Sequence, residues 1–273
     1  MAKVLIVGGN GMLGHALRSV WAEAVVGDKD KLDITKQSDV NREISELSPE
    51  LIINAAAYTN VDGAEKERDL AFAINETGVR NLALAAKESG AILVHYSTDY
   101  VFNGKQEAGY GEDDEPGPAV NVYGESKLAG EKALREIAPK YYLLRTAWLY
   151  GAYGKNFVET MLRLVGEKKE LGVVNDQWGS PTYTMDLAGA TKEVVSGGYE
   201  PGVYHAVNSG RASWYDFAVK IFELAGMKVI VRPIASSEYP LPAARPKYSI
   251  LNNTRGPVLR PWETALDEYI KTR

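Results

Sequence analysis

The sequence contains no cysteine, which excludes disulfide scaffolds, thiolate metal ligands and a cysteine nucleophile. It has no excess of basic residues either, because 31 lysines and arginines stand against 36 aspartates and glutamates. With no basic block along the chain, we expect no nucleic-acid partner. No window approaches about 18 uninterrupted apolar residues, the length of a membrane-spanning helix. The chain begins directly on an apolar strand pattern without a leader segment, so we expect a soluble cytoplasmic protein with no membrane partner.

The 273 residues suffice for two domains of roughly 150 residues or for one enlarged α/β domain. A hydrophobic content of 45% and a charged content of 25% are typical of a globular protein. In the first half, apolar runs typical of buried strands alternate with helical periodicity. The predicted strands are 3–7, 24–27, 51–54, 92–97 and 142–146. The predicted helices are 12–21, 40–47, 64–89 and 120–137.

This alternation predicts a Rossmann-type, doubly wound parallel sheet over residues 1–147. Beyond it, turn-rich segments separate shorter periodic runs, so we expect a smaller C-terminal α/β substrate lobe over 148–273, with some segments returning to the core. The helical runs of this second half are 157–167, 185–195, 214–225 and 262–270. Its strand-like runs are 172–174, 203–207 and 229–231.

Three glycines, Gly8, Gly11 and Gly14, follow the first predicted strand and open the first predicted helix. Their missing side chains let the backbone turn tightly and approach a pyrophosphate held at a helix N-terminus. Asp28, 20 residues after Gly8, sits where a carboxylate binds the adenosine ribose of NAD, whereas Lys29 beside it suits a 2′-phosphate. The pattern therefore predicts a dinucleotide, favours NADPH and leaves NADH open.

Tyr123 and Lys127 lie four residues apart, hence on one face of a predicted helix. We expect the ammonium to lower the pKa of the phenol, which makes tyrosine a usable acid toward a carbonyl oxygen. Ser97 and Thr98 end the fourth predicted strand, where open α/β sheets place their ligand crevice. Hydroxyl, phenol and ammonium would converge there on a nicotinamide.

Ordered motifs along nearly the whole chain resemble the short-chain dehydrogenase/reductase superfamily in its extended, nucleotide-sugar-modifying branch, and within it the dTDP-4-dehydrorhamnose reductases. These motifs are the glycine turn 8–14, Asn-Ala-Ala-Ala-Tyr-Thr-Asn-Val-Asp at 54–62, Ser-Thr-Asp-Tyr-Val-Phe-Asn-Gly at 97–104, Asn-Val-Tyr-Gly-Glu-Ser-Lys-Leu-Ala-Gly-Glu at 121–131, Arg-Thr-Ala-Trp-Leu-Tyr-Gly at 145–151, Asn-Phe at 156–157, Asp-Gln-Trp-Gly-Ser-Pro-Thr at 176–182 and Arg-Pro at 245–246.

The resemblance implies NAD(P)H-dependent reduction of the C4 ketone of dTDP-4-dehydro-L-rhamnose to dTDP-L-rhamnose, for cell-surface polysaccharide. It implies that Tyr123 donates the proton, that Lys127 assists it and binds ribose, and that Thr98 binds the carbonyl. The implied coenzyme site comprises Gly8, Asn10, Gly11, Met12, Leu13, Gly14, Asp28, Lys29, Asp33, Ile34, Asn54, Ala55, Ala56, Ala57, Tyr58, Ser97, Tyr123 and Lys127. The implied substrate site comprises Val61, Thr98, Asp99, Tyr100, Tyr123, Trp148, Asn156, Gln177 and Arg245, the last suited to a diphosphate.

One departure from the family concerns assembly. Some bacterial members carry a glutamate two residues after the third glycine as part of a magnesium-bridged dimer, and this chain has Ala16 there. The three histidines show no metal-ligand spacing, so we expect no metal site. A homodimer without metal stays open.

Two other functions remain as alternatives. Nucleotide-sugar epimerases and dehydratases share the fold, the tyrosine and the lysine, but dehydratases commonly carry Thr-Asp-Glu where this chain has Thr98-Asp99-Tyr100. The β subunit of methionine adenosyltransferase resembles the same branch and would bind a dinucleotide without turnover. The presence of Tyr123, Lys127 and Thr98 favours an enzyme.

Overall fold

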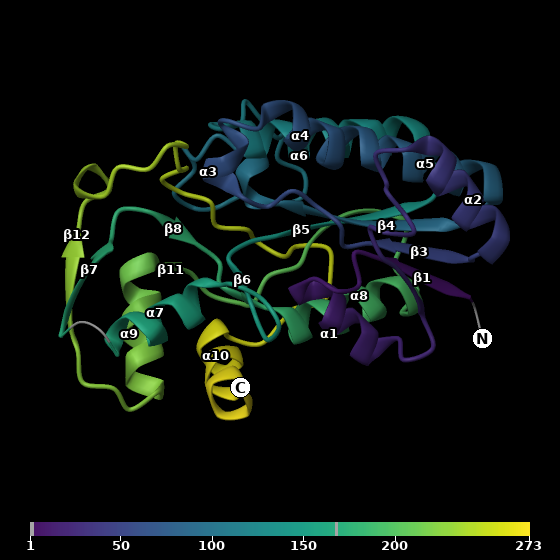
Figure 1. Cartoon of the computed structure of the whole chain (residues 1–273). Coiled ribbons are helices and arrows are strands. Elements are labelled where there is room, and N and C mark those ends of the chain that lie inside the picture. Colours follow the sequence, from purple (N-terminus) through teal and green to yellow (C-terminus); the bar gives the residue numbers. More distant parts are fainter. Residues whose placement is uncertain (1–2, 167–168) are drawn as a thin grey trace.

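A six-stranded parallel sheet forms the centre of the chain (Figure 1). The structure is a computed structural model that describes residues 3–166 and 169–273. The strand order is β10-β5-β4-β3-β1-β2. The connection from β1 leads to β2 on one side, and the following strands β3, β4, β5 and β10 lie on the other side of β1, so the topological switch point is between β1 and β3. The strands are β1 (Val4–Val7), β2 (Val25–Gly27), β3 (Leu51–Asn54), β4 (Ile92–Thr98), β5 (Tyr141–Thr146) and β10 (Gly202–His205). This confirms the predicted Rossmann-type parallel sheet, in which ligands bind at the carboxyl edge near such a switch point.

Helices cover both faces of the sheet because its strands are apolar on both sides. Within β1, Leu5 and Val7 face one core cluster while Val4 and Ile6 face another. The first face is covered by α2 (Gln37–Leu47), α5 (Gly78–Ser89) and α6 (Val122–Ile137). The opposite face is covered by α1 (Met12–Val20) and α8 (Thr184–Ser196). Both α8 and β10 come from the second half of the chain, which therefore contributes to the central core.

The single helix expected over 64–89 is wrong. The chain instead forms α3 (Val61–Ala64), α4 (Arg68–Phe72), a π-helical turn Ala73–Thr77 and then α5. Asn75 in the π turn explains the irregularity, because its amide bonds both backbone groups of Tyr58 and the hydroxyl of Ser126. A polar side chain thus binds inward where apolar periodicity predicted a regular helix.

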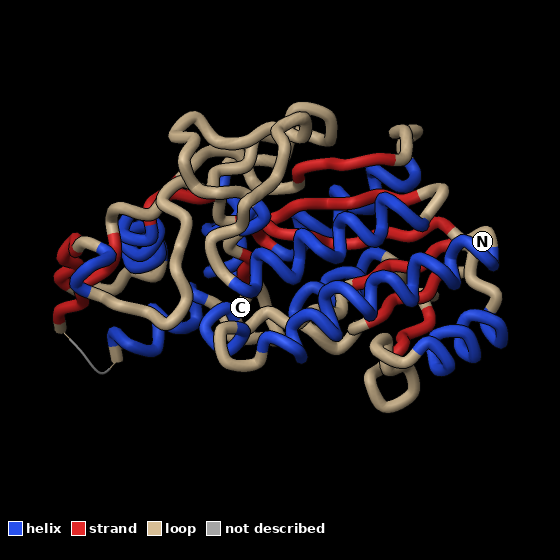
Figure 2. Tube along the Cα trace, turned by 90° about the horizontal axis from the view of Figure 1, so that it is seen from above, coloured by secondary structure: helices blue, strands red, loops and turns tan. Residues whose placement is uncertain are grey.

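An aromatic core organises the C-terminal lobe, which lies at one end of the sheet (Figures 1 and 2). Its helices are α7 (Phe157–Val165), α9 (Trp214–Leu224) and α10 (Trp262–Thr272). Its strand pairs are β6 (Leu149–Tyr150) with β9 (Thr182–Tyr183), β7 (Glu170–Val174) with β12 (Ile230–Ile234), and β8 (Trp178–Gly179) with β11 (Ala212–Ser213). Across residues 3–166 and 169–273, no helix has both the length and the apolar character needed to cross a bilayer.

Candidate active site

The glycine turn between β1 and α1 is built for close backbone contact. A Cβ atom on Gly14 would lie 2.4 Å from the carbonyl oxygen of Gly8, so only glycine lets α1 begin against the turn. Gly11 caps α1 without a side-chain hydrogen bond, and a Cβ there would meet only Gly8 at 3.4 Å. The first N–H groups of α1 therefore have no side-chain cap and lie at the positive end of the helix dipole, an arrangement that fits a phosphate. Met12 and Leu13 supply those first N–H groups.

The segment after β3 lies against this turn. The side chain of Asn54 accepts a hydrogen bond from the Ala56 N–H at 3.1 Å and donates to His95 Nδ1 at 3.1 Å. Ala55, Ala56 and Ala57 are half-buried, and their short side chains protrude little from the surface beside the turn. Tyr58 is buried, and its hydroxyl bonds Glu67. The side chains of Asn54 and Tyr58 thus hold the loop itself.

The residues after β2 form the adenosine side of the candidate dinucleotide site. Asp28 accepts a 2.7 Å hydrogen bond from Asn10, whose amide oxygen lies 3.5 Å from Nη1 of Arg18. Two exposed cations belong to this region, since Arg18 contacts the Asn10 amide that bonds Asp28 and Lys29 follows Asp28 in the chain. Sequence reasoning missed Arg18, because it lies a helical turn beyond the glycines and only the fold returns it to β2.

Two further predicted residues of this region are engaged locally. Asp33 accepts hydrogen bonds from the hydroxyl and the N–H of Thr35, and these bonds lower the pKa of its carboxyl. Ile34 lies in the core, where its carbonyl oxygen accepts from Asn81 at 2.8 Å. Their contacts with a coenzyme stay predictions.

Tyr123 meets Thr98 because α6 begins directly against the segment that follows β4. Asn121 caps α6 through the Gly124 N–H at 2.8 Å. A Cβ on Gly124 would lie 2.3 Å from the carbonyl oxygen of Tyr100, so this approach requires glycine. The phenol of Tyr123 then interacts with the Thr98 hydroxyl at the carboxyl end of β4.

Lys127 is buried one turn further along α6 and points into the sheet. Its Nζ donates to the carbonyl oxygen of Tyr96 at 2.6 Å and lies 3.4 Å from Nε2 of His95. Burial lowers the pKa of Lys127 to about 8, against the opposing charge of Glu131. His95, also buried, was not anticipated as its neighbour.

The expected lowering of the Tyr123 pKa is wrong for the chain without bound ligands. Burial and the Asp99 charge raise the pKa of Tyr123 to about 12, while the Thr98 hydroxyl acts in the opposite direction. Lys127 contributes no resolved effect because its ammonium is directed at Tyr96 and His95. Tyr123 is thus a protonated phenol at neutral pH.

Buried polar atoms without partners gather at the carboxyl ends of β4 and β5. Among the described residues, Ser97 Oγ, Asp99 Oδ2 and Thr146 Oγ1 have no hydrogen-bond partner. Thr98 and Thr146 are register neighbours in the sheet, so these atoms belong to one region. Buried polar groups are normally paired, and such a group of unpaired atoms is consistent with a polar ligand. Thr146 was not anticipated, because one more threonine in a strand is ordinary.

An aromatic stack begins where the chain leaves β5. Trp148 adopts a positive φ of 45°, which is rare for a bulky residue, and lies against Gly179. Its ring stacks on Trp214 with centroids 3.4 Å apart. Gln177 fixes the stack by accepting from Trp214 Nε1 at 3.2 Å while donating to Ser236 at 2.8 Å. Trp214 was not anticipated from the sequence.

Gln177 and Arg245 line a common cavity of about 450 Å³, to which Lys247 adds a second cation. Arg245 is paired with Asp62 through Nη2 and Oδ2 at 3.0 Å. Burial would raise the pKa of Asp62, but its bonds with Arg245 and the Ala243 N–H lower it. The structure therefore unites two predicted substrate residues and shows that Arg245 already has a carboxylate partner.

Asn156 is not among the residues that line this cavity. It caps α7, accepting from the Glu159 N–H at 3.1 Å and donating to the Gly151 carbonyl at 2.9 Å. Its predicted substrate contact stays a prediction beside this structural role. Val61 begins α3, next to the Asp62 that holds Arg245.

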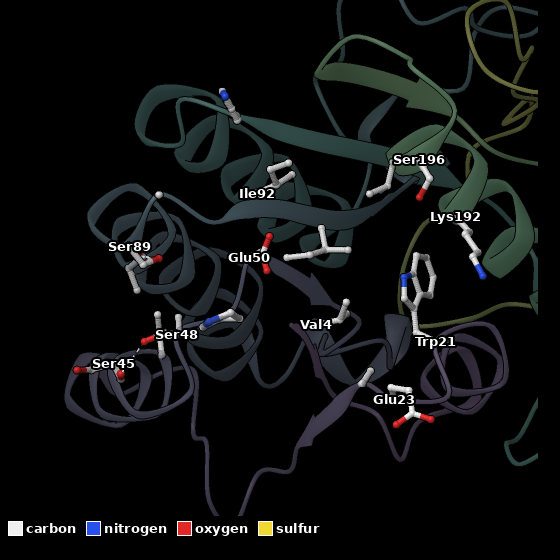
Figure 3. A pocket seen from close by; sticks show the side chains of 18 of the residues that line it. Val4, Trp21, Glu23, Ser45, Ser48, Glu50, Ser89, Ile92, Lys192 and Ser196 are labelled. Carbon is white, nitrogen blue, oxygen red and sulfur yellow. Dashed lines mark hydrogen bonds between the residues drawn. The ribbon is translucent and has the colours of Figure 1, made fainter. Parts of the chain in front are cut away.

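Another cavity, of about 1230 Å³, lies away from this site (Figure 3). Val4, Leu51 and Ile92 line it, and each is the first residue of its strand. It therefore opens at the amino edge of the sheet, away from every candidate residue. In residues 3–166 and 169–273, no cluster of His, Asp or Glu suits a metal ion, and Ala16 is buried in the core.

Comparisons with known proteins identify the family of this chain. The family model described as the RmlD substrate binding domain matches residues 2–273. The chain is 42% identical to the Bacillus subtilis spore coat polysaccharide biosynthesis protein SpsK, covering 100% of this chain and 98% of the relative. It is 42% identical to the dTDP-4-dehydrorhamnose reductase of Mycolicibacterium smegmatis, covering 98% of this chain and 85% of that one.

Solved structures show the same likeness. A Bacillus anthracis dTDP-4-dehydrorhamnose reductase in complex with NADP is 46% identical, with a TM-score of 0.94 over 100% of this chain and 99% of that one. The Thermus thermophilus UDP-glucose 4-epimerase complex with NAD is 20% identical, with a TM-score of 0.80 over 99% of both chains, and supports the fold alone.

Proposed function

The chain belongs to the RmlD substrate binding domain family, and we propose that it reduces the C4 ketone of dTDP-4-dehydro-L-rhamnose to dTDP-L-rhamnose with NADPH. The observation that carries the proposal is the meeting of Tyr123 and Thr98 at the carboxyl edge of the sheet, near the uncapped start of α1. A ketone held there would contact a phenol and a hydroxyl while a dinucleotide lies on the glycine turn. NADPH, when bound, supplies the hydride to the carbonyl carbon.

Each of the three central side chains has a distinct role in this proposal. Tyr123 gives its phenolic proton to the carbonyl oxygen, and its raised pKa keeps that proton in place until the oxygen becomes basic. Lys127, mostly charged at neutral pH, would bind the coenzyme ribose, since its ammonium is directed at Tyr96 and His95 and not at the phenol. Thr98 orients the carbonyl by a hydrogen bond to its oxygen.

The remaining candidates divide between coenzyme and nucleotide sugar. Arg18 and Lys29, the two exposed cations of the region around Asp28, supply the positive charge that a 2′-phosphate needs, which supports NADPH over NADH. Arg245 and Lys247 supply charge for the diphosphate of the sugar nucleotide. This proposal assigns coenzyme binding to residues 1–147 and treats 148–273 mainly as a substrate-binding lobe, with some segments returning to the core. We further propose that the enzyme is cytoplasmic, because reduced coenzyme and activated sugars are held there. We also propose a homodimer, which gel filtration would test.

The test is coenzyme oxidation with enzymatically prepared dTDP-4-dehydro-L-rhamnose. We expect the absorbance of NADPH to fall and NMR to identify the rhamnose product, with NADH run in parallel. Tyr123→Phe should lower kcat by about 10²–10⁴-fold. The control is Tyr141→Phe at the start of β5, away from the carboxyl edge of the sheet, which should leave kcat unchanged. Absence of coenzyme oxidation would contradict the proposal, and coenzyme retained through purification would favour an epimerase.

A further inference from the structure

The hydroxyl of Thr98 has a single proton to donate and several neighbours that compete for its bonds. Its Oγ1 lies 2.8 Å from Asp99 Oδ1 and 3.2 Å from the backbone nitrogen of Tyr100. The Tyr100 N–H can only donate, so it occupies a lone pair of the hydroxyl. A carboxylate can only accept, so an ionised Asp99 takes the one hydroxyl proton. Thr98 then has no proton left for a substrate carbonyl.

A neutral Asp99 reverses this arrangement. Its carboxylic acid O–H donates to Thr98 Oγ1 across the same 2.8 Å contact. The Thr98 proton is then free to point at the substrate oxygen, beside the phenol of Tyr123. The chain of donors runs from acid to hydroxyl to carbonyl, and each bond in such a chain polarises the next.

The surroundings of Asp99 favour the neutral acid. The side chain is 2% exposed, and its Oδ2 has no hydrogen-bond partner within the described part of the chain. A buried carboxylate with one unsolvated oxygen is costly, whereas a neutral acid loses much less. Burial raises the pKa of Asp99 to about 7, although the hydroxyls of Ser249 and Thr98 and the backbone N–H groups of Asp99 and Tyr100 favour its charged form.

The other titratable groups around Asp99 are phenols, which are neutral near pH 7. Tyr100 follows it in the chain and Tyr123 faces it from α6. Arg245, the cation of the neighbouring loop, acts on Tyr100 and is paired with Asp62. No cation is therefore resolved as a partner that would hold the Asp99 carboxyl ionised.

We propose that Asp99 is a positioning residue that acts through Thr98: as a neutral acid it donates its proton to the Thr98 hydroxyl, which frees that hydroxyl to bind the substrate carbonyl. The inference rests on the proposed reduction and adds a pH-sensitive step to it. As pH rises through about 7, Asp99 loses its proton and Thr98 turns away from the carbonyl. The rate should then fall by up to about tenfold per pH unit.

The first test is the pH dependence of kcat, with each profile normalised to its own value near pH 6. The wild-type protein should decline with a midpoint near 7, and Asp99→Asn should lack that step because an amide donates at every pH. Asp267→Asn, a surface acid on α10, is the matched control and should keep the wild-type profile. An unchanged step in Asp99→Asn, or a wild-type rate that rises through pH 7, would overturn the proposal.

Two further measurements test whether Asp99 acts through Thr98 and distinguish this inference from the proposed function. In a Thr98→Val background, Asp99→Asn should have no additional effect on the pH profile, because the hydroxyl through which Asp99 acts is gone. Infrared difference spectra should show a protonated carboxylic acid band near pH 6 that Asp99→Asn removes. If no substrate is reduced at any pH, the proposed function fails, and the infrared band alone decides whether Asp99 is a neutral acid.

Discussion

Arg145 and Glu131 form an ion pair in the core, between the sheet and α6. Each side chain is 1% exposed, and the contacts Nε–Oε1 and Nη2–Oε2 measure 3.0 and 2.7 Å. The guanidinium also lies over the ring of Phe102, 5.0 Å from its centroid. Arg145→Met would leave the Glu131 carboxylate buried without its partner, and Glu131→Met would do the same to the guanidinium.

The geometry sets the expected magnitude. Both contacts are charge-assisted and fully buried, so breaking the pair from either side should lower the free energy of unfolding by about 3–5 kcal/mol. The melting temperature should fall by roughly 10 °C for a chain of this size. The double variant Glu131→Met/Arg145→Met leaves no unpaired charge and should lose less than either single variant.

Urea unfolding measures these differences, with far-UV circular dichroism and tryptophan fluorescence recorded on the same samples. If the two probes give the same unfolding curve and the urea dependence of the free energy of unfolding is unchanged, the midpoints of the variants can be compared directly. The reasoning is refuted if either single variant loses less than about 1 kcal/mol, or if the double variant loses the sum of the two.

Two further predictions concern the binding surfaces. Gly14→Ala places a Cβ 2.4 Å from the Gly8 carbonyl oxygen and should weaken NADPH binding at least about tenfold, as measured by fluorescence titration. The control is Gly189→Ala on α8, where a Cβ meets nothing within 4 Å. It should leave NADPH binding unchanged and stabilise the helix by up to about 1 kcal/mol. Arg245→Ala should raise the KM of the dTDP-sugar about tenfold or more with a smaller effect on kcat, and an unchanged KM would mean that Arg245 serves only to hold its loop through Asp62.

The sheet and the glycine turn were predictable because their signals are local. Apolar β-branched runs identify buried strands, and Gly8, Gly11 and Gly14 follow the first of them directly. The strand-end position of Thr98 and the helical position of Tyr123 predicted that their side chains converge, whereas the contact itself depends on α6 beginning against the end of β4. Helical spacing placed Tyr123 and Lys127 on one face but did not reveal that Lys127 bonds the Tyr96 carbonyl.

The features that escaped prediction depend on tertiary contacts. Asn75 breaks a helical pattern because its partners, Tyr58 and Ser126, lie 17 and 51 residues away. Arg245 finds Asp62 across 183 residues, and no periodicity encodes such a separation. Local pattern therefore specifies the elements, while the partners of buried polar groups follow from the assembled fold.

The amide of Asn121 carries a consequence for how this scaffold can diversify. Its oxygen accepts a hydrogen bond at the start of α6, which bears Tyr123, and its nitrogen donates a 2.8 Å hydrogen bond to the backbone carbonyl of Ala244 in the loop 239–247. Because the loop contributes a main-chain oxygen to this bond, the bond does not depend on which side chain stands at position 244. Under the proposed function, substitutions in 239–247 could therefore change which sugar nucleotide is accepted while the start of α6 stays in place.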